Sequence, residues 1–316
     1  MSSPALFLED LRKRYSRRGP WVLDGLTCRF PRGCVSGLVG PNGAGKTTLF
    51  SAIVDFVKLE GGRVDILGEG PFEAFRFKGR IGVLPQDAQL DPRLTPHAFL
   101  RGMGQLQGLS RSESVAAAEA ALRSVNMAER GAEKVGALSH GMRRRISVAS
   151  ALLGHPELVL LDEPTAGLDP REAASLRSLL KGLGGATSVV VSSHNLAELE
   201  QICDHVVLIE AGRCLGEGTV EELTARGGVE VWSLGPGHVD LAAISNALPG
   251  HSIELVDQTL VHKAATETAL DAGSIVIAGQ LSRAGVAIRG VRRGHTLEDS
   301  YLERTQSTGS PQDGSP

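Results

Sequence analysis

The stretch that decides the fold is "GPNGAGKTT" (40–48), which follows the apolar run "CVSGLV" (34–39) and leads into the helical pattern "TTLFSAIVDFV" (47–57). It matches the pattern G-x-x-x-x-G-K-[ST] in the strand, turn and helix context that the pattern needs. Glycines let backbone N–H groups converge on phosphate oxygens, and the helix start adds the positive end of its dipole. The predicted nucleotide contacts are Gly40, Pro41, Asn42, Gly43, Ala44, Gly45, Lys46, Thr47 and Thr48. Lys46 is expected to reach the β and γ phosphates, and Thr47 to bind Mg²⁺.

A second motif, "LVLLDEP" (158–164), places two carboxylates at the end of an apolar run. Four apolar residues predict a buried strand, and ligand chemistry in parallel sheets gathers at the carboxyl ends of the strands. We expect Asp162 to hold Mg²⁺, mostly through water, and Glu163 to polarise an attacking water molecule. The alternative, in which the acidic pair only caps the next turn beside Pro164, is less favoured once a phosphate-binding loop is present.

The stretch "LSHGMRRR" (138–145) is open to three interpretations. Ser139 can cap the helix that follows, and Gly141 leaves backbone space at its start, so a γ-phosphate can dock there. A Ser-His nucleophile pair is excluded, because it needs a G-x-S-x-G elbow and adjacent side chains point in different directions. The arginines at 143–145 are more typical of a solvated helix face than of a nucleic-acid patch, since no aromatic residues lie between them.

The composition indicates an ordinary soluble protein with two domains. The chain has 316 residues, a formal net charge of -3 and no apolar run long enough to cross a membrane, and it begins without a signal-peptide pattern. Its four cysteines show neither CxxC spacing nor the density of a disulfide scaffold, so reduced thiols without a metal are expected. We therefore predict a cytosolic chain whose bulk charge recruits neither nucleic acid nor an anionic membrane.

Short apolar runs alternate with helical patterns over the first two thirds of the chain, which predicts an α/β domain with a parallel sheet covered on both faces. The runs are 34–40, 80–86, 157–163, 187–194 and 204–218. Segments 1–30 and 62–68 predict antiparallel strands at the edge of this sheet. A helical insert is expected at about 88–155, with Thr95 as an N-cap before Pro96.

A glycine break near 225–228 separates this first domain, residues 1–225, from a weaker alternation of short strands and helices. Residues 229–304 therefore predict a separate small α/β domain. The final segment, "TQSTGSPQDGSP" (305–316), is rich in Ser, Gly, Pro and Gln and has almost no apolar residues. This composition predicts a disordered tail.

In the order of its motifs, the sequence resembles the ATP-binding subunits of ATP-binding cassette (ABC) transporters over about residues 5–225. The family signature usually reads LSGGQ, and "LSHGM" keeps its leucine, Ser139 and Gly141 while having His140 and Met142 in the other two places. The resemblance implies a P-loop NTPase cassette with a mixed sheet, an antiparallel edge and a helical subdomain. It also implies ATPase activity with ATP and Mg²⁺, and a dimer in which the signature of one subunit closes over the ATP of its partner.

The same resemblance implies roles for four further residues. Gln86, in "LPQD", resembles the Q-loop glutamine that touches Mg²⁺ and the attacking water, and His194, in "VSSHN", resembles the switch histidine that contacts the γ-phosphate. Asp169, in "GLDP", resembles the D-loop residue that crosses the dimer interface. Tyr15 takes the place of the aromatic residue that stacks on adenine, with Trp21 as its nearby alternative.

Two stretches resemble the subtype that serves ABC-2 permeases, which are mostly exporters. "LSHGMRRR" is close to the form LSxGMxxR, and "HTLEDSYLERT" (295–305) is close to a C-terminal S-L-E-D-x-[FY]-L ending. The resemblance implies a homodimer, without nucleic acid, on the inner face of the cell membrane, bound to a separate ABC-2-type permease that docks near Gln86 and 88–105. Residues 229–304 would stabilise or regulate the dimer, or only pack. The competing classes are an ABC ATPase acting on nucleic acid or ribosomes, and one that transmits force to a membrane partner without moving a solute.

Overall fold

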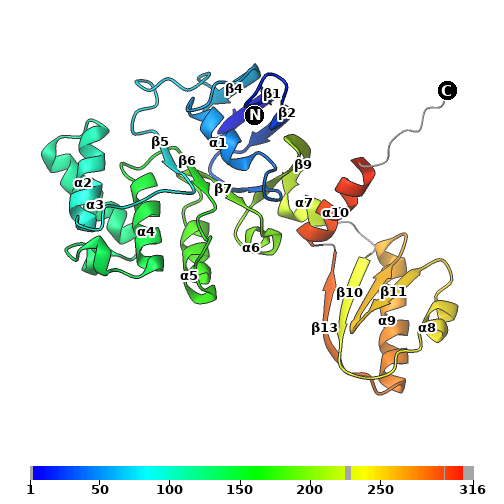
Figure 1. Cartoon of the computed structure of the whole chain (residues 1–316). Helices are drawn as coiled ribbons and strands as arrows, with labels where there is room; N and C mark the ends of the chain where they lie inside the picture. Colours follow the sequence, from blue (N-terminus) through cyan, green and yellow to red (C-terminus); the bar gives the residue numbers. More distant parts are fainter. Residues whose placement is uncertain (1–2, 225–228, 295, 309–316) are drawn as a thin grey trace. The chain divides into compact units, whose positions relative to one another are not determined.

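The structure is a computed structural model that describes residues 3–224, 229–294 and 296–308 (Figure 1). The chain divides into two compact units. The first extends to Thr219 and also takes in the chain from Ser307, the end of helix α10 (Leu297–Thr308) included, and the second runs from Val220 to Gln306. Each unit has a hydrophobic core of its own. Within the described ranges, none of the helices combines the length and the apolar character needed to cross a membrane.

The first unit is built on a six-stranded sheet with the strand order β5-β6-β7-β3-β8-β9. Its strands are β3 (Val35–Val39), β5 (Ile81–Leu84), β6 (Leu158–Asp162), β7 (Ser188–Ser193), β8 (His205–Glu210) and β9 (Arg213–Thr219). All neighbouring pairs except β8 and β9 are parallel. Every residue of β3, β6 and β7 is buried, as expected for strands covered on both faces, so the predicted parallel sheet is confirmed.

The run 204–218 departs from the predicted parallel arrangement. It forms two strands, β8 and β9, which pair antiparallel as a hairpin at the edge of the sheet. The two residues of the turn, Ala211 and Gly212, have positive φ angles of 46° and 75°. Positive φ at both central positions is typical of tight turns that fit the twist of a hairpin. One apolar run therefore contains two strands, and the mixed character of the sheet comes from β9.

The predicted antiparallel strands near the N-terminus form a sheet of their own instead of extending the main one. This three-stranded sheet has the order β2-β1-β4 and consists of β1 (Leu6–Lys13), β2 (Leu23–Phe30) and β4 (Gly61–Ile66). Leu8 of β1 shares a core with Leu49 of helix α1 (Lys46–Ile53) and with Val207 of β8. Packing against both sheets thus fixes α1 and the phosphate-binding loop that precedes it.

A helical segment follows β5 and lies together at one end of the unit (Figure 1). It comprises α2 (Pro96–Leu106), α3 (Arg111–Ser124), the 3₁₀ turns Ala128–Arg130 and Val135–Ala137, and α4 (His140–Ala151). The predicted cap of α2 is present, because Thr95 Oγ1 accepts the Ala98 N–H at 3.1 Å and Pro96 is the first helical residue. Two more helices follow the strands β6 and β7, namely α5 (Pro170–Lys181) and α6 (Leu196–Glu200).

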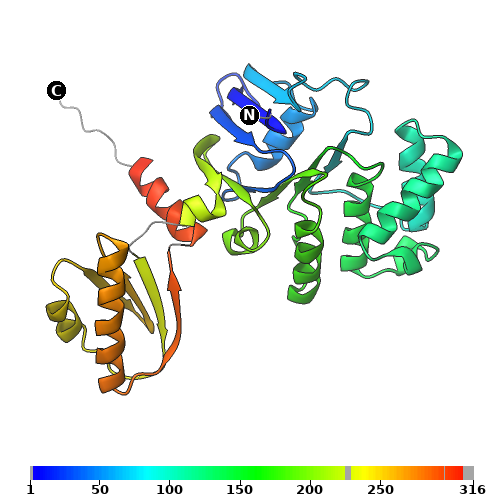
Figure 2. The same ribbon diagram turned by 180° about the vertical axis from the view of Figure 1, so that it is seen from behind.

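The second unit is a four-stranded antiparallel sheet with helices on one face (Figure 2). Its elements are α7 (Val220–Thr224), β10 (Val229–Leu234), α8 (Leu241–Ala247), β11 (Ser252–Val256), β12 (Thr259–Lys263), α9 (Glu267–Arg283), β13 (Ile288–Arg293) and α10 (Leu297–Thr308). From β10 to β13 the chain order is βαββαβ, and the strand order is β11-β12-β10-β13. This arrangement is the ferredoxin-like split βαβ motif. Trp232, Leu260 and Ile277 belong to its core.

The limits of the two units differ in detail from the predicted ones. The division falls at Thr219, before the predicted boundary at 225, because α7 packs within the second unit, where Ser300 Oγ donates to the Leu223 carbonyl. Helix α10 continues to Thr308, so residues 305–308 are helical although they were predicted to be disordered. The remainder of the predicted tail, 309–316, lies outside the described residues.

Candidate active site

The phosphate-binding loop begins where β3 ends and leads directly into α1. Gly45, the residue before α1, has a φ of 104°, in the left-handed region that favours glycine. Gly40 lies against β8, since a Cβ at this position would be 2.3 Å from the Ile209 carbonyl oxygen. The two glycines that the pattern requires are thus needed for different reasons, a turn at Gly45 and a close approach of backbone at Gly40. The loop leaves the N-terminus of α1 as a site for an anion.

Lys46 is buried, with 6% of its surface exposed. Its Nζ donates to the carbonyl oxygens of Gly40 and Pro41, at 2.8 and 3.1 Å, and lies 3.5 Å from Glu163 Oε1. The ammonium is therefore held inside the curve of the loop by partners from both sequence motifs. A phosphate oxygen that enters the loop meets this charge directly.

The Thr47 hydroxyl and the Asp162 carboxylate meet at the start of α1. Thr47 Oγ1 donates to Asp162 Oδ2 at 2.6 Å, and Ser192 Oγ of β7 donates to Asp162 Oδ1 at 2.5 Å. Hydroxyl and carboxylate oxygens are the hard donors that Mg²⁺ prefers, and Mg²⁺ completes its shell with waters and substrate phosphates. The pair formed by Thr47 and Asp162 fits this ion.

The Glu163 carboxylate has other partners than that of Asp162. The Glu163 backbone has a φ of 45°, which is uncommon for a residue other than glycine. Ser192 Oγ accepts the Glu163 N–H at 2.9 Å. The Glu163 carboxylate lies 3.3 Å from His194 Nδ1, so one carboxylate contacts both an imidazole and the Lys46 ammonium. This arrangement suits polarisation of a water molecule beside a phosphate.

Lys46, Thr47 and Glu163 border a pocket of about 320 Å³. Its lining consists of Val22, Asn42, Gly43, Gly45, Lys46, Thr47, Thr48, Gln86 and Glu163. The predicted aromatic residue, Tyr15, is 67% exposed, and its hydroxyl lies 3.1 Å from Thr48 Oγ1. The alternative, Trp21, lies under the Arg14 guanidinium, 4.4 Å from its ring centroid. The Tyr15 ring also has a cation over it, since Lys13 Nζ lies 5.5 Å from its centroid. Trp21 is half-buried, so Tyr15 is the more exposed of the two rings.

Comparisons with known proteins identify the family. The family model described as "ABC transporter" matches residues 23–166, which include both carboxylates of the site. The chain is also 34% identical over 311 residues to the daunorubicin resistance ATP-binding protein DrrA3 of Streptomyces coeruleorubidus, a match that covers 96% of this chain and 97% of that relative. The chain belongs to the ABC transporter family.

Two further likenesses fit this assignment. The Nod factor export ATP-binding protein I of Ralstonia nicotianae is 36% identical over 224 residues, 70% of this chain and 69% of that protein. The solved structure of cbiO1 from Clostridium perfringens, part of the ABC transporter complex cbiONQ, matches with a TM-score of 0.62 and 27% identity, over 70% of this chain and 90% of that one. The first unit is an ABC cassette, and the chain is an ATP-binding subunit with transport ATPase activity, as the sequence predicted.

The predicted signature and D-loop residues of this ABC cassette do not line the pocket beside Lys46. Ser139 caps α4, its Oγ accepting the Met142 N–H at 3.1 Å, and Gly141 is buried in the first turn of that helix. Asp169 caps α5, its Oδ1 accepting the N–H groups of the next two non-proline residues at 2.9 Å. The structure thus brings the P-loop together with Gln86, Asp162, Glu163 and His194, and leaves Ser139, Gly141 and Asp169 apart.

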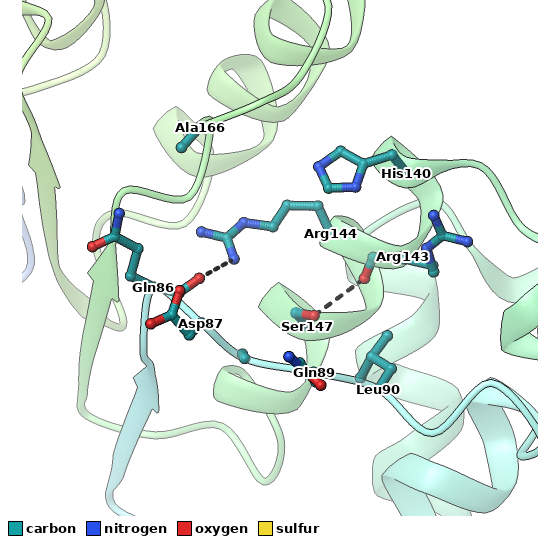
Figure 3. A pocket seen from close by; sticks show the side chains of 10 residues that line it. Gln86, Asp87, Gln89, Leu90, His140, Arg143, Arg144, Ser147 and Ala166 are labelled. Carbon is teal, nitrogen blue, oxygen red and sulfur yellow. Dashed lines mark hydrogen bonds between the residues drawn. The ribbon is translucent and has the colours of Figure 1, made fainter.

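Sequence reasoning missed Arg144, which was expected on a solvated helix face with its two arginine neighbours. Arg144 is buried, and its guanidinium donates to the carbonyl oxygens of Asp162, Glu163 and Pro164 at 3.1, 2.7 and 2.8 Å. Burial lowers the pKa of the Arg144 guanidinium from its ordinary value. Its Nη1 also donates to the Gln86 carbonyl at 3.4 Å, so one side chain of α4 ties the signature helix to both segments that carry catalytic candidates (Figure 3).

Proposed function

We propose that the chain powers an ABC-2-type permease that exports its substrate. The observation that carries this proposal is the likeness to a daunorubicin resistance ATP-binding protein, because it extends over 96% of the chain and so includes the second unit. A second relative, 36% identical, is named for Nod factor export. The first name describes resistance to a compound and the second describes export, which supports export over import.

In the proposed site, Lys46 and the start of α1 bind the ATP phosphates, and Tyr15 stacks on the adenine. Thr47 and Asp162 are the proposed Mg²⁺ ligands, with Gln86 reaching the ion from the loop after β5. Bound Mg²⁺ would offset phosphate charge and fix the terminal phosphoryl group for in-line attack. The 2.6 Å contact between Thr47 Oγ1 and Asp162 Oδ2 and the presence of Gln86 in the pocket support this assignment.

Glu163 is the proposed acceptor of the proton from the attacking water, and His194 holds the γ-phosphate beside it. The partner cassette supplies Ser139, Gly141 and Asp169, so two copies of this chain enclose two ATP molecules. Hydrolysis removes the γ-phosphate contacts that hold the dimer closed, and the dimer opens. Because a single chain carries all of these residues, a homodimer has two complete sites.

A second pocket, of about 580 Å³, supports a docking site for the permease (Figure 3). It lies between the loop after β5 and α4, and its lining is Gln86, Asp87, Ala88, Gln89, Leu90, His140, Arg143, Arg144, Ser147 and Ala166. We propose that a cytoplasmic helix of the permease enters it, which would hold the cassette on the inner face of the membrane. Gln86 and Arg144 belong to this pocket and also contact the ATP site, so they can transmit a change from one to the other.

The test is affinity purification of the tagged chain from membranes with ATP, comparing Glu163→Gln with Lys46→Ala. Glu163→Gln keeps the binding groups and removes the proton acceptor, so it should hold the dimer closed, whereas Lys46→Ala should not close. We expect a protein with several membrane spans in both samples and the dimer only with Glu163→Gln. Ribosomes or nucleic acid without a membrane protein would overturn the transport proposal and leave the ATPase assignment intact. A partner with a single span would favour force transmission without transport.

A further inference from the structure

A carboxylate lies over the start of the signature helix. Ser139 Oγ donates to Glu172 Oε1 at 3.3 Å. A Cβ built on Gly141 would lie 2.2 Å from Cδ and Oε2 of Glu172 and 2.4 Å from its Oε1, so the carboxylate rests directly against this glycine. Gly141 is consequently buried within a single cassette. Ser139 and Gly141 are the two residues proposed above to receive the γ-phosphate of the partner's ATP.

The position of Glu172 follows from how α5 begins. Asp169 caps the helix and Pro170 is its first residue, and the Glu172 N–H is bound to Asp169 Oδ1 at 2.9 Å. Glu172 is therefore fixed at its backbone in the first turn of α5, with only side-chain bonds free to rotate. Its carboxylate can leave Gly141 by a change of rotamer, without any movement of α5.

The Glu172 carboxylate and a γ-phosphate would compete for the same two features of the signature. The Ser139 hydroxyl accepts the Met142 N–H and has a single proton to donate, which in this structure goes to Glu172. The N-terminus of α4 attracts one anion through its dipole and its free N–H groups, and a second anion at the same place meets like charge. Ser139 and Gly141 can therefore serve the carboxylate or the phosphate, but not both.

We propose that Glu172 is a built-in competitor for the γ-phosphate of the partner's ATP and must withdraw from the signature before the two cassettes close. This inference rests on the ATP-enclosing dimer proposed above. Closure of the two cassettes therefore requires a higher ATP concentration than it would if Glu172 did not contact the signature. Glu172 thus opposes ATP-driven closure of two copies of the chain into the dimer.

The test is an ATP titration of dimer formation by light scattering, in the Glu163→Gln background, for Glu172→Gln and Glu172→Ala. Glu172→Gln keeps the size of the side chain and removes its charge, and Glu172→Ala removes the contact with Gly141. Removal of an anion from a helix N-terminus changes binding there by roughly two- to fivefold per site, so we expect the ATP midpoint to fall by at least about twofold in both variants. The matched control is Glu129→Gln, an exposed carboxylate beyond α3, which should leave the midpoint unchanged.

An unchanged midpoint in both Glu172 variants would overturn the inference and leave the dimer proposal standing. A raised midpoint would also overturn it, because Glu172 would then position the Ser139 hydroxyl for the phosphate. If the Glu163→Gln parent forms no dimer at any ATP concentration, the dimer proposal fails and the inference falls with it. In the wild-type background, Glu172→Gln should lower the KM for ATP without lowering kcat.

Discussion

At the scale of single residues, one hydroxyl joins the two acidic residues of the site. Ser192 Oγ donates to Asp162 Oδ1 and accepts the Glu163 N–H, so it orients the proposed metal ligand and the proposed proton acceptor together. Ser192 does not line the proposed ATP pocket. Its effect on the reaction therefore passes through Asp162 and Glu163.

Replacing Ser192 with alanine is expected to lower kcat by roughly ten- to hundredfold, the usual range for loss of a group that orients a metal ligand. ATP affinity without Mg²⁺ should change little, because the Lys46 contacts remain. The measurements are phosphate release and nucleotide binding over a range of Mg²⁺ concentrations. Ser193→Ala is the matched control, since Ser193 is also buried at the end of β7 but bonds the Asn195 N–H. Equal losses in the two variants would contradict the role given to Ser192.

The site residues predicted from single motifs are those whose spacing is local. Lys46 and Thr47 follow from one nine-residue motif, and Asp162 from the end of one apolar run. Ser192 could not be predicted in this way, because it meets Asp162 only through the parallel pairing of β6 and β7, in which the two residues are directly opposite. The only indication of Ser192 in the sequence was the pair of serines, 192–193, directly before His194. Arg144 was missed because its partners are backbone carbonyls. Every residue type has a backbone carbonyl, so the sequence does not indicate which ones an arginine will bind.

At the scale of elements, the strand runs were predicted better than their order. β3 lies between β7 and β8, which follow it in the chain only after the whole helical segment. This order depends on contacts between distant segments and has no local signature. The hairpin of β8 and β9 was not predicted, because its turn consists of only two residues, Ala211 and Gly212, and the two strands read as one apolar run.

The close contact between α4 and β5 leads us to predict how a glycine substitution there changes the free energy of unfolding. A Cβ on Gly82 of β5 would lie 1.7 Å from the Ala151 carbonyl oxygen, at the end of α4. Gly82→Ala is therefore expected to lower the free energy of unfolding by about 1–3 kcal/mol, as overpacking does. Gly102→Ala in α2, where a Cβ meets nothing within 4 Å, should raise it by up to about 1 kcal/mol. Urea unfolding of both variants is the measurement, and shifts of the same sign would contradict the packing described.

A histidine pair in the second unit predicts a dependence of its stability on pH. His262 is fully buried, and its Nε2 lies 2.8 Å from His251 Nδ1. Burial, and then the neighbouring His251, lower the pKa of His262, while Glu230 acts in the opposite direction. Below about pH 6.5, His262 therefore binds a proton more readily in the unfolded chain than in the folded chain. The free energy of unfolding then falls as the pH drops, by at most about 1.4 kcal/mol per pH unit.

The measurement is unfolding followed by Trp232 fluorescence between pH 5 and 8, in a Trp21→Phe chain so that only the second unit reports. In a His262→Leu variant the dependence on pH should flatten. Stability that stays constant, or that rises as the pH falls, would contradict the lowered pKa of His262.

At the scale of the whole molecule, the sequence separates an ABC cassette from a second unit but gives no topology for that unit. The central strands of the cassette, β3, β6 and β7, are continuous buried runs, so they stand out. In the second unit β11 alternates between exposed and half-buried residues, and all six residues of β13 are exposed. A sheet with one covered face and exposed edges leaves a weak pattern, which explains why the ferredoxin-like arrangement appears only in the structure.

The central claim is that two copies of this chain close around ATP and hydrolyse it. The most direct measurement is the mass in solution of the Glu163→Gln chain, 33.3 kDa per copy, by light scattering with and without ATP and Mg²⁺. The account predicts that ATP doubles the mass and that one ATP is retained per chain, while Lys46→Ala keeps the mass it has without nucleotide. A Glu163→Gln chain that binds ATP and does not change its mass would contradict the account.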